Sequence, residues 1–163
     1  MTEITPPVGY RPPTWVRRAL VNPVARSLLL RGHAGGRGEQ NLMRVLRVPG
    51  RNSGRLYDVP LRIAVRDGRQ YVVSLTGQTE WARNLRAAAG GSLVYGDRTD
   101  LVAAVELSPD EKVDFLRWYC TVPAHRLSVR AGLRLNPRRP APEELARAAR
   151  QHPVFRLTPA PGT

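Results

Sequence analysis

Apolar and polar residues alternate over short segments along most of the chain, and this pattern predicts β-strands joined by hairpins. Residues 57–66 show it most clearly, because every second residue on one face is apolar: Val59, Leu61, Ile63 and Val65. Successive side chains of a strand point to opposite faces of a sheet. The dipeptide Asp67-Gly68 then predicts a tight hairpin turn. The pattern predicts further strands over residues 41–48, 70–75, 93–95, 100–107 and 154–158.

Helices are predicted where a capping residue precedes a segment of helical period. Thr79 is a suitable cap for a helix over residues 80–89. The glycine pair Gly90-Gly91 is expected to end this helix.

Two more helices are predicted in the C-terminal half of the chain. The segment Ser108–Glu111 begins the first of them with a capping box, and its proline suits the first turn. The second covers residues 143–151 and ends before Pro153. Residues 121–140 fit either a helix or a packed loop.

Five or six strands, mostly in hairpins, together with a few helices predict an α+β fold that is mainly β: a small antiparallel barrel decorated by helices. Residues 41–163 are expected to form this barrel, and residues 1–40 an N-terminal arm followed by a basic amphipathic helix. That helix is predicted over residues 14–31, kinked or split at Pro23, with one apolar and one basic side.

The composition narrows the classes of partner. The formal net charge of the 163-residue chain is +13, which suits nucleic acid, an anionic membrane surface or an acidic cofactor. The arginines are spread along the chain, which argues against a specific nucleic-acid partner. Cys120 is the only cysteine, so an internal disulfide is excluded and a buried small side chain is expected. The histidines show no metal-ligand spacing, and no metal is expected.

The N-terminal segment and the hydropathy bear on location. Residues 1–13 are proline-rich and lack the apolar core of a signal peptide, and no apolar run is long enough to span a bilayer. We therefore expect a cytoplasmic protein. The amphipathic segment 14–31 is expected to lie over the active-site entrance or to associate peripherally with a membrane, and packing on the barrel is the alternative.

The loop between the first two strands reads Gly-Arg-Asn-Ser-Gly-Arg at positions 50–55 and carries the main candidate chemistry. Its two glycines allow positive φ and a close approach of the backbone to a ligand. Arg51 and Arg55 carry forked donors that suit phosphate or carboxylate, and Ser53 adds a neutral donor. This composition predicts an anion-holding loop, and a solvated basic turn is the alternative.

The loop is the first of several features that, in order, resemble the family of deazaflavin-dependent nitroreductases and F420H2-dependent quinone reductases. The others are Pro60, a hairpin ending in Val72-Val73-Ser74, the run Trp81-Ala-Arg-Asn84-Leu85 before a glycine, and residues 152–157 as a C-terminal strand. The resemblance implies a split β-barrel of the type that binds FMN. It also implies the binding of coenzyme F420, a deazaflavin with a phosphate and an oligoglutamate tail.

The resemblance implies a cofactor site as well. Arg51, Ser53 and Arg55 match the residues that hold the cofactor phosphate, while Asn52 stands where the family commonly has a lysine or arginine. The residues that would lie near the deazaflavin ring are Pro60, Ser74, Thr76, Gly77, Trp81 and Asn84. Trp81 and Asn84 are three residues apart and share a helix face. An ordinary core tryptophan is the alternative for Trp81.

The activity implied is transfer of a hydride from reduced coenzyme F420 to a small-molecule acceptor, which is a quinone, a nitro compound or an activated alkene. Tyr57, Ser74 and Tyr119 are candidate proton donors by residue type. Each of them also fits an ordinary strand or core position. Residues 121–140 lack the tyrosine-rich segment of the better-known quinone reductases, so the resemblance does not imply quinone specificity.

Two other classes of function remain open from the sequence. One is a split-barrel protein that binds FMN, haem or a non-redox ligand. The other is a basic module that binds nucleic acid or a membrane surface through its charge.

Overall fold

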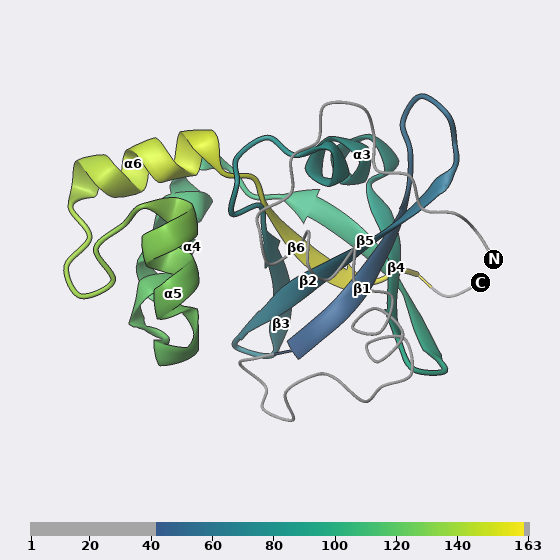
Figure 1. The fold of residues 1–163 in the computed structure, drawn as a ribbon, viewed down its shortest axis with the longest axis horizontal. Helices are drawn as coiled ribbons and strands as arrows, with labels where there is room; N and C mark the ends of the chain where they lie inside the picture. The colour runs from purple at the N-terminus through teal and green to yellow at the C-terminus, as the bar shows by residue number, and fades with distance from the viewer. Residues whose placement is uncertain (1–41, 162–163) are drawn as a thin grey trace.

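The centre of the fold is a closed antiparallel barrel of six strands in the part of the chain that the structure, a computed structural model, describes: residues 42–161 (Figure 1). The strands are β1 (Leu42–Pro49), β2 (Leu56–Arg66), β3 (Arg69–Val73), β4 (Gly90–Tyr95), β5 (Arg98–Glu106) and β6 (Val154–Pro159). Their order around the barrel is β1-β2-β3-β6-β5-β4, and β1 pairs with β4 to close it. The predicted α+β fold, a barrel with helices, is confirmed.

Local sequence signals account for most of the strand pairing. The β2–β3 turn is made by Asp67 and Gly68, which both have positive φ, of 51° and 72°, as a two-residue hairpin of this type requires. The interior of the barrel is an apolar cluster to which all six strands contribute side chains, among them Leu46, Ile63 and Phe155. The period-two pattern therefore indicates which residues of each strand face inward.

One expectation about the second half of the barrel is wrong. Gly90 and Gly91 do not end the preceding helix but begin β4, and Ala89, with φ of 53°, is the left-handed residue that caps the helix. A Cβ atom at Gly90 would lie 2.5 Å from the Val102 carbonyl oxygen, and one at Gly91 would lie 2.6 Å from the Arg47 carbonyl oxygen. The glycines are needed because neighbouring strands approach closely here, not because the helix must stop.

Helix α3 (Glu80–Ala88) contacts β1, β4 and β5 and covers one end of the barrel (Figure 1). Thr79 caps it as predicted, since its side chain accepts a hydrogen bond from the Ala82 amide. Trp81, Ala82 and Leu85 are buried in the barrel core. This packing fixes the orientation of α3, and its remaining face is available for a site.

The other helices gather on one side of the barrel, at left in Figure 1. They are α4 (Pro109–Thr121), which begins with the predicted capping box of Ser108 and Glu111, and α6 (Pro142–Gln151). Between them, residues 121–140 form neither one helix nor a plain loop. They form three short helical turns, η1 (Pro123–His125), α5 (Arg126–Ser128) and η2 (Val129–Leu133), followed by an irregular segment.

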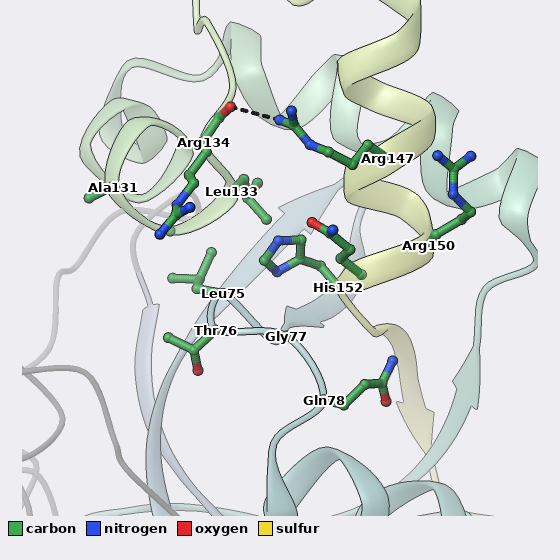
Figure 2. A pocket seen from close by; sticks show the side chains of 12 residues that line it. Leu75, Thr76, Gly77, Gln78, Ala131, Leu133, Arg134, Arg147, Arg150 and His152 are labelled. Carbon is green, nitrogen blue, oxygen red and sulfur yellow. Dashed lines mark hydrogen bonds between the residues drawn. The ribbon is translucent and has the colours of Figure 1, made fainter.

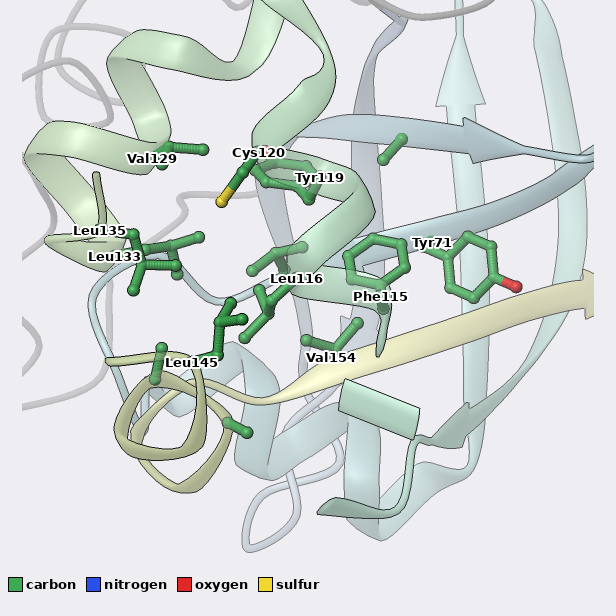
Figure 3. Close-up of a cluster of buried hydrophobic side chains, with 14 of the residues drawn as sticks. Tyr71, Phe115, Leu116, Tyr119, Cys120, Val129, Leu133, Leu135, Leu145 and Val154 are labelled. Atoms are coloured by element: carbon green, nitrogen blue, oxygen red, sulfur yellow. The ribbon is translucent and has the colours of Figure 1, made fainter. Parts of the chain in front are cut away.

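These helices enclose a second apolar core, shown in Figure 3, that Tyr71 and Val154 connect to the barrel. The Cys120 side chain lies in it as predicted, 3% exposed, and burial raises the pKa of its thiol to about 11. No helix within residues 42–161 is long and apolar enough to cross a membrane. The predicted helix over residues 14–31 and the predicted domain boundary at residue 41 lie outside the described residues.

Candidate active site

The loop at positions 50–55 is a closed turn rather than an extended connection. The Gly50 amide donates to the Arg55 carbonyl at 2.8 Å, and the Gly54 amide donates to the Gly50 carbonyl at 2.8 Å. A Cβ atom at Gly50 would lie 2.6 Å from Cε2 of Tyr57, so the ring of Tyr57 occupies the space that a larger residue would need. Gly54 has a φ of 68° and open space around it. The turn therefore depends on both glycines.

Arg51 attaches this loop to α3. Its Nη1 atom donates to Oε2 of Glu80 at 2.6 Å and to Oδ1 of Asn84 at 3.0 Å. The Arg51 amide donates to the same Asn84 oxygen at 3.2 Å. The hydrogen bond from Arg51 lowers the pKa of the Glu80 carboxyl below its usual range. The structure thus brings together Arg51 and Asn84, which the sequence had placed in one site, and adds Glu80, which it had not.

The remaining polar residues of the loop are exposed. Ser53 Oγ accepts a hydrogen bond from the Arg55 amide at 3.2 Å and lies 3.5 Å from the Tyr57 hydroxyl. Within the described chain, the Arg55 guanidinium has no hydrogen-bond or ion-pair partner in the structure. Asn52 lies at the exposed tip of the turn. The loop therefore offers the Arg55 guanidinium and part of Arg51 to an anion from solution.

Ser74 organises the turn that connects β3 to α3. It is fully buried, and its hydroxyl contacts the Gly77 carbonyl oxygen at 2.5 Å and the Thr79 hydroxyl at 2.9 Å. Its amide donates to the Pro153 carbonyl at 2.9 Å. Because Thr79 is also the cap of α3, the hydroxyl of Ser74 fixes the turn and the start of the helix together.

A pocket of about 770 Å³ opens beside this turn, as Figure 2 shows. Its walls are the turn, the η2 segment with the residue after it, and the C-terminal end of α6, which supply residues 75–78, 131–134, 147 and 150–152. The turn and η2 meet closely, since a Cβ atom at Gly132 would lie 3.0 Å from that of Leu75. The volume is in the range of pockets that hold a small organic molecule.

His152 lines the pocket and is 7% exposed. Its Nδ1 atom lies 2.8 Å from the Ser74 carbonyl oxygen. A carbonyl oxygen can only accept, so Nδ1 carries the proton and donates it, and Nε2 is left as an acceptor. Burial lowers the pKa of His152 below its usual value, with a smaller contribution from the nearby charge of Arg147. His152 is therefore neutral at neutral pH.

The other predicted site residues lie elsewhere. Trp81 is 5% exposed and sits in the barrel core, with its ring centroid 6.3 Å from that of Phe155. Tyr119 stacks on His125 at 3.9 Å in the helical core, and burial raises its pKa to about 12. Pro60 is buried in β2. None of these three lines the pocket, whereas Thr76 and Gly77 do.

The pocket also contains residues that the sequence reasoning missed. His152 was noted only as part of a strand, and Arg134, Arg147 and Arg150 were not singled out. For two of these arginines the available signal was their spacing of three residues on α6, but such spacing is also typical of an ordinary solvated helix face.

A model of the family described as F420H(2)-dependent quinone reductase matches residues 13–131. The chain belongs to this family. It is accordingly an F420-dependent oxidoreductase, and its cofactor is coenzyme F420. This membership agrees with the resemblance of the 50–55 loop and of the Ser74, Trp81 and Asn84 positions, and it excludes the reading of the chain as a purely basic binding module.

Solved structures similar to this family member include an F420-H2 dependent reductase, FDR-A, which is 19% identical, with 71% of this chain and 93% of that chain covered and a TM-score of 0.47. An F420 reductase is 15% identical, with 83% of this chain and 93% of that chain covered and a TM-score of 0.41. A protein of unknown function from Agrobacterium tumefaciens is 20% identical, with 91% of this chain and 59% of that chain covered and a TM-score of 0.50. The last likeness concerns the fold alone. No curated protein matched the chain.

Proposed function

We propose that this enzyme transfers a hydride from reduced coenzyme F420 to a small-molecule acceptor bound in the pocket beside the Ser74–Gly77 turn. The acceptor is a quinone, a nitro compound or an activated alkene. The supporting observation is a continuous line of contacts from the cationic loop to the pocket. Arg51 contacts Glu80 of α3, the preceding Thr79 contacts Ser74, and Ser74 contacts Gly77 in the pocket wall.

The loop residues fit the anionic part of the cofactor. Charge-assisted hydrogen bonds to a phosphate are roughly twice as strong as neutral ones, and Arg51 and Arg55 supply guanidinium donors on the same turn. Ser53 adds a hydroxyl. Asn52 adds an amide but no charge, so we expect the loop to hold the phosphate through two cations. Glu80 opposes this binding, because its carboxylate already forms an ion pair with the Arg51 guanidinium.

The residues around the turn would hold the ring. When bound, coenzyme F420 supplies the hydride. Thr76 and Gly77 form part of the pocket wall, and the Ser74 hydroxyl holds this segment through its hydrogen bond to the Gly77 carbonyl. Asn84 and the buried Trp81 hold α3 and the loop in position, rather than facing the pocket.

Reduction of the acceptor by a hydride also requires a proton. Of the three candidate donors, Tyr57 lies under the loop, Tyr119 is buried in the helical core, and Ser74 is engaged by Gly77 and Thr79. None of them lines the pocket. We therefore assign proton delivery to water in the open pocket.

The test is anaerobic mixing of the enzyme and reduced coenzyme F420 with a naphthoquinone, a nitroaromatic compound and an enone, one at a time. The deazaflavin absorbance reports oxidation of the cofactor. We expect oxidation with at least one of these acceptors. It should be slowed in Arg55→Ala and unchanged in Arg98→Ala, whose exposed side chain is at the start of β5. Failure of all three acceptor classes would overturn the proposal.

A further inference from the structure

The pocket beside the Ser74–Gly77 turn is strongly cationic. Arg134 lines it from the residue after η2, and Arg147 and Arg150 line it from α6. In Figure 2 the Arg147 side chain extends towards Arg134, whereas that of Arg150 lies on the other side of α6 and points away from the turn. The twelve lining residues include no aspartate or glutamate. An open pocket lined by arginines and by no carboxylate attracts anions and focuses their approach.

These three arginines differ from others in the fold. Arg47 pairs with Asp58 at 2.7 Å, and Arg86 pairs with Glu106 at 2.6 Å. In contrast, no acidic side chain of residues 42–161 lies within 4.0 Å of the guanidinium groups of Arg134, Arg147 and Arg150. Their charge is not neutralised by that part of the chain, and it is available to a ligand.

The arginines are also positioned by the fold. Arg147 Nη2 donates to the Arg134 carbonyl oxygen at 3.1 Å, which ties α6 to the segment after η2. On the opposite wall, His152, the residue after α6, lies with its Nδ1 atom 2.8 Å from the Ser74 carbonyl oxygen, so a hydrogen bond joins the turn to the end of α6. Contacts between these elements therefore set the distance from the arginines to the Ser74–Gly77 turn. The deazaflavin ring is proposed to lie beside this turn.

His152 lies between these walls and remains neutral. Its Nδ1–H donates to the Ser74 carbonyl, which leaves Nε2 to accept a hydrogen bond from a ligand. The charge of the pocket thus comes from the arginines, while Leu75 and Leu133 supply apolar surface beside them. Apolar surface beside guanidinium groups suits an organic molecule that carries an acidic group.

We propose that the acceptor of this enzyme carries a carboxylate, which Arg147 and Arg134 bind on the η2 side of α6 while the reducible group lies against the turn. This inference rests on the proposed function. Guanidinium groups bind carboxylates through paired hydrogen bonds, so the arginines would select an acidic acceptor over a neutral one of the same shape.

The cofactor carries carboxylates too, on its glutamate tail, and the fold separates the two anion sites. In Figure 1 helix α3 lies between the β1–β2 loop, which contains Arg51 and Arg55, and helix α6, which contains Arg147 and Arg150. We assign the phosphate and tail to the loop and the acceptor carboxylate to the pocket.

The experiment measures binding to the full chain saturated with oxidised coenzyme F420, so that no turnover occurs. The probes are a 1,4-naphthoquinone that bears a carboxylate and the methyl ester of the same compound, compared by equilibrium dialysis at low and high salt. We expect the acid to bind about tenfold more tightly than the ester at low salt, and less so at high salt. Equal binding of the two probes would overturn the inference.

Variants assign the effect to the arginines. Arg134→Gln/Arg147→Gln should remove the preference for the acid, while Arg138→Gln, at an exposed position outside the pocket, should keep it. Since the Arg147 side chain also donates to the Arg134 carbonyl, melting temperatures will separate a loss of stability from a loss of binding. Loss of the preference in the control variant as well would overturn the assignment.

Cofactor affinity, measured in the same variants, keeps this inference separate from the proposed function. We expect unchanged affinity for coenzyme F420. If the double variant loses affinity for the complete cofactor but not for the deazaflavin without its phosphate and tail, the arginines bind the tail and the inference is wrong. If the parent chain binds no coenzyme F420, the proposed function fails.

Discussion

The guanidinium of Arg51 donates a 2.6 Å hydrogen bond to the carboxylate of Glu80, across the gap between the β1–β2 loop and the first turn of α3. The two side chains are 31% and 20% exposed, so water and ions reach the pair. A phosphate that binds Arg51 must compete with Glu80 or share the guanidinium with it. Glu80 is therefore expected to limit the affinity of the loop for its anionic ligand.

Replacing Glu80 with glutamine should tighten the binding of coenzyme F420. The change removes the competing charge, and exposed pairs of this kind are worth up to about 1 kcal/mol, which corresponds to roughly fivefold in affinity. Fluorescence titration measures the effect. Glu143→Gln, the matching acidic residue in the first turn of α6, should bind like the parent. Weaker binding by Glu80→Gln would show that Glu80 supports the clamp instead of opposing it.

Arg51→Ala and Arg55→Ala should both weaken cofactor binding, by roughly tenfold to a hundredfold. They should differ in stability. Arg51 holds Glu80 and the buried Asn84, so its loss should also lower the free energy of unfolding by about 1–2 kcal/mol. Arg55 has an exposed side chain, and its loss should leave stability unchanged. Urea unfolding beside each titration separates the two effects. Parent-like binding by both variants would mean that the loop is a solvated turn.

Ser74 is expected to act by positioning the turn, not by transferring a proton. Ser74→Ala should cost about 1–3 kcal/mol of stability, because it leaves buried partners unsatisfied. Thr79→Val removes the other hydroxyl of the same contact and should lower stability to a similar degree. A double-mutant cycle should show strong coupling between the two changes. If Ser74→Ala alone slows hydride transfer while binding and stability stay unchanged, Ser74 has a chemical role.

His152 should make stability depend on pH. Burial lowers its pKa in the folded chain below its usual value of 6.5. The unfolded chain then binds a proton at this residue at a higher pH than the folded chain does, so folding stability is complete above about pH 6.5 and falls as the pH decreases below it. His152→Asn keeps a donor for Ser74 but does not titrate, and its unfolding curves should depend less on pH in this window. Parallel pH profiles for parent and variant would contradict this account.

That pH window is distinct from the one set by the acidic residues. Hydrogen bonds from Arg51 and from Arg86 lower the pKa of Glu80 and of Glu106, respectively, below 4.5. Their contribution to stability is present above that pH and is lost as the pH falls through their folded-state values. A loss of stability just below pH 6.5 therefore reports on a histidine.

The elements of the barrel could be predicted because their signals are local. The alternation in β2, the Asp67-Gly68 turn and the Ser108 capping box each depend on residues that are adjacent or a few positions apart. Gly90 and Gly91 were assigned to a helix end because their requirement, the close approach of Val102 and Arg47, involves strands distant in sequence.

The site was predictable only in part, because several of its contacts join residues that are distant in sequence. The loop residues stood out by composition, and spacing placed Trp81 and Asn84 on one helix face. Spacing alone could not show that Trp81 turns into the core while Asn84 meets Arg51. The pocket arginines come from two segments that meet only in the folded chain. The predictions for residues 14–31, membrane association included, remain predictions.

Equilibrium dialysis of the full chain against oxidised coenzyme F420 and against FMN, at matched concentrations, tests the central claim most directly. The absorbance of the retained ligand gives both affinity and stoichiometry. We predict stoichiometric retention of the deazaflavin, tighter than that of FMN, with the preference lost in Arg51→Ala/Arg55→Ala. Tighter binding of FMN, or no retention of the deazaflavin, would contradict the account.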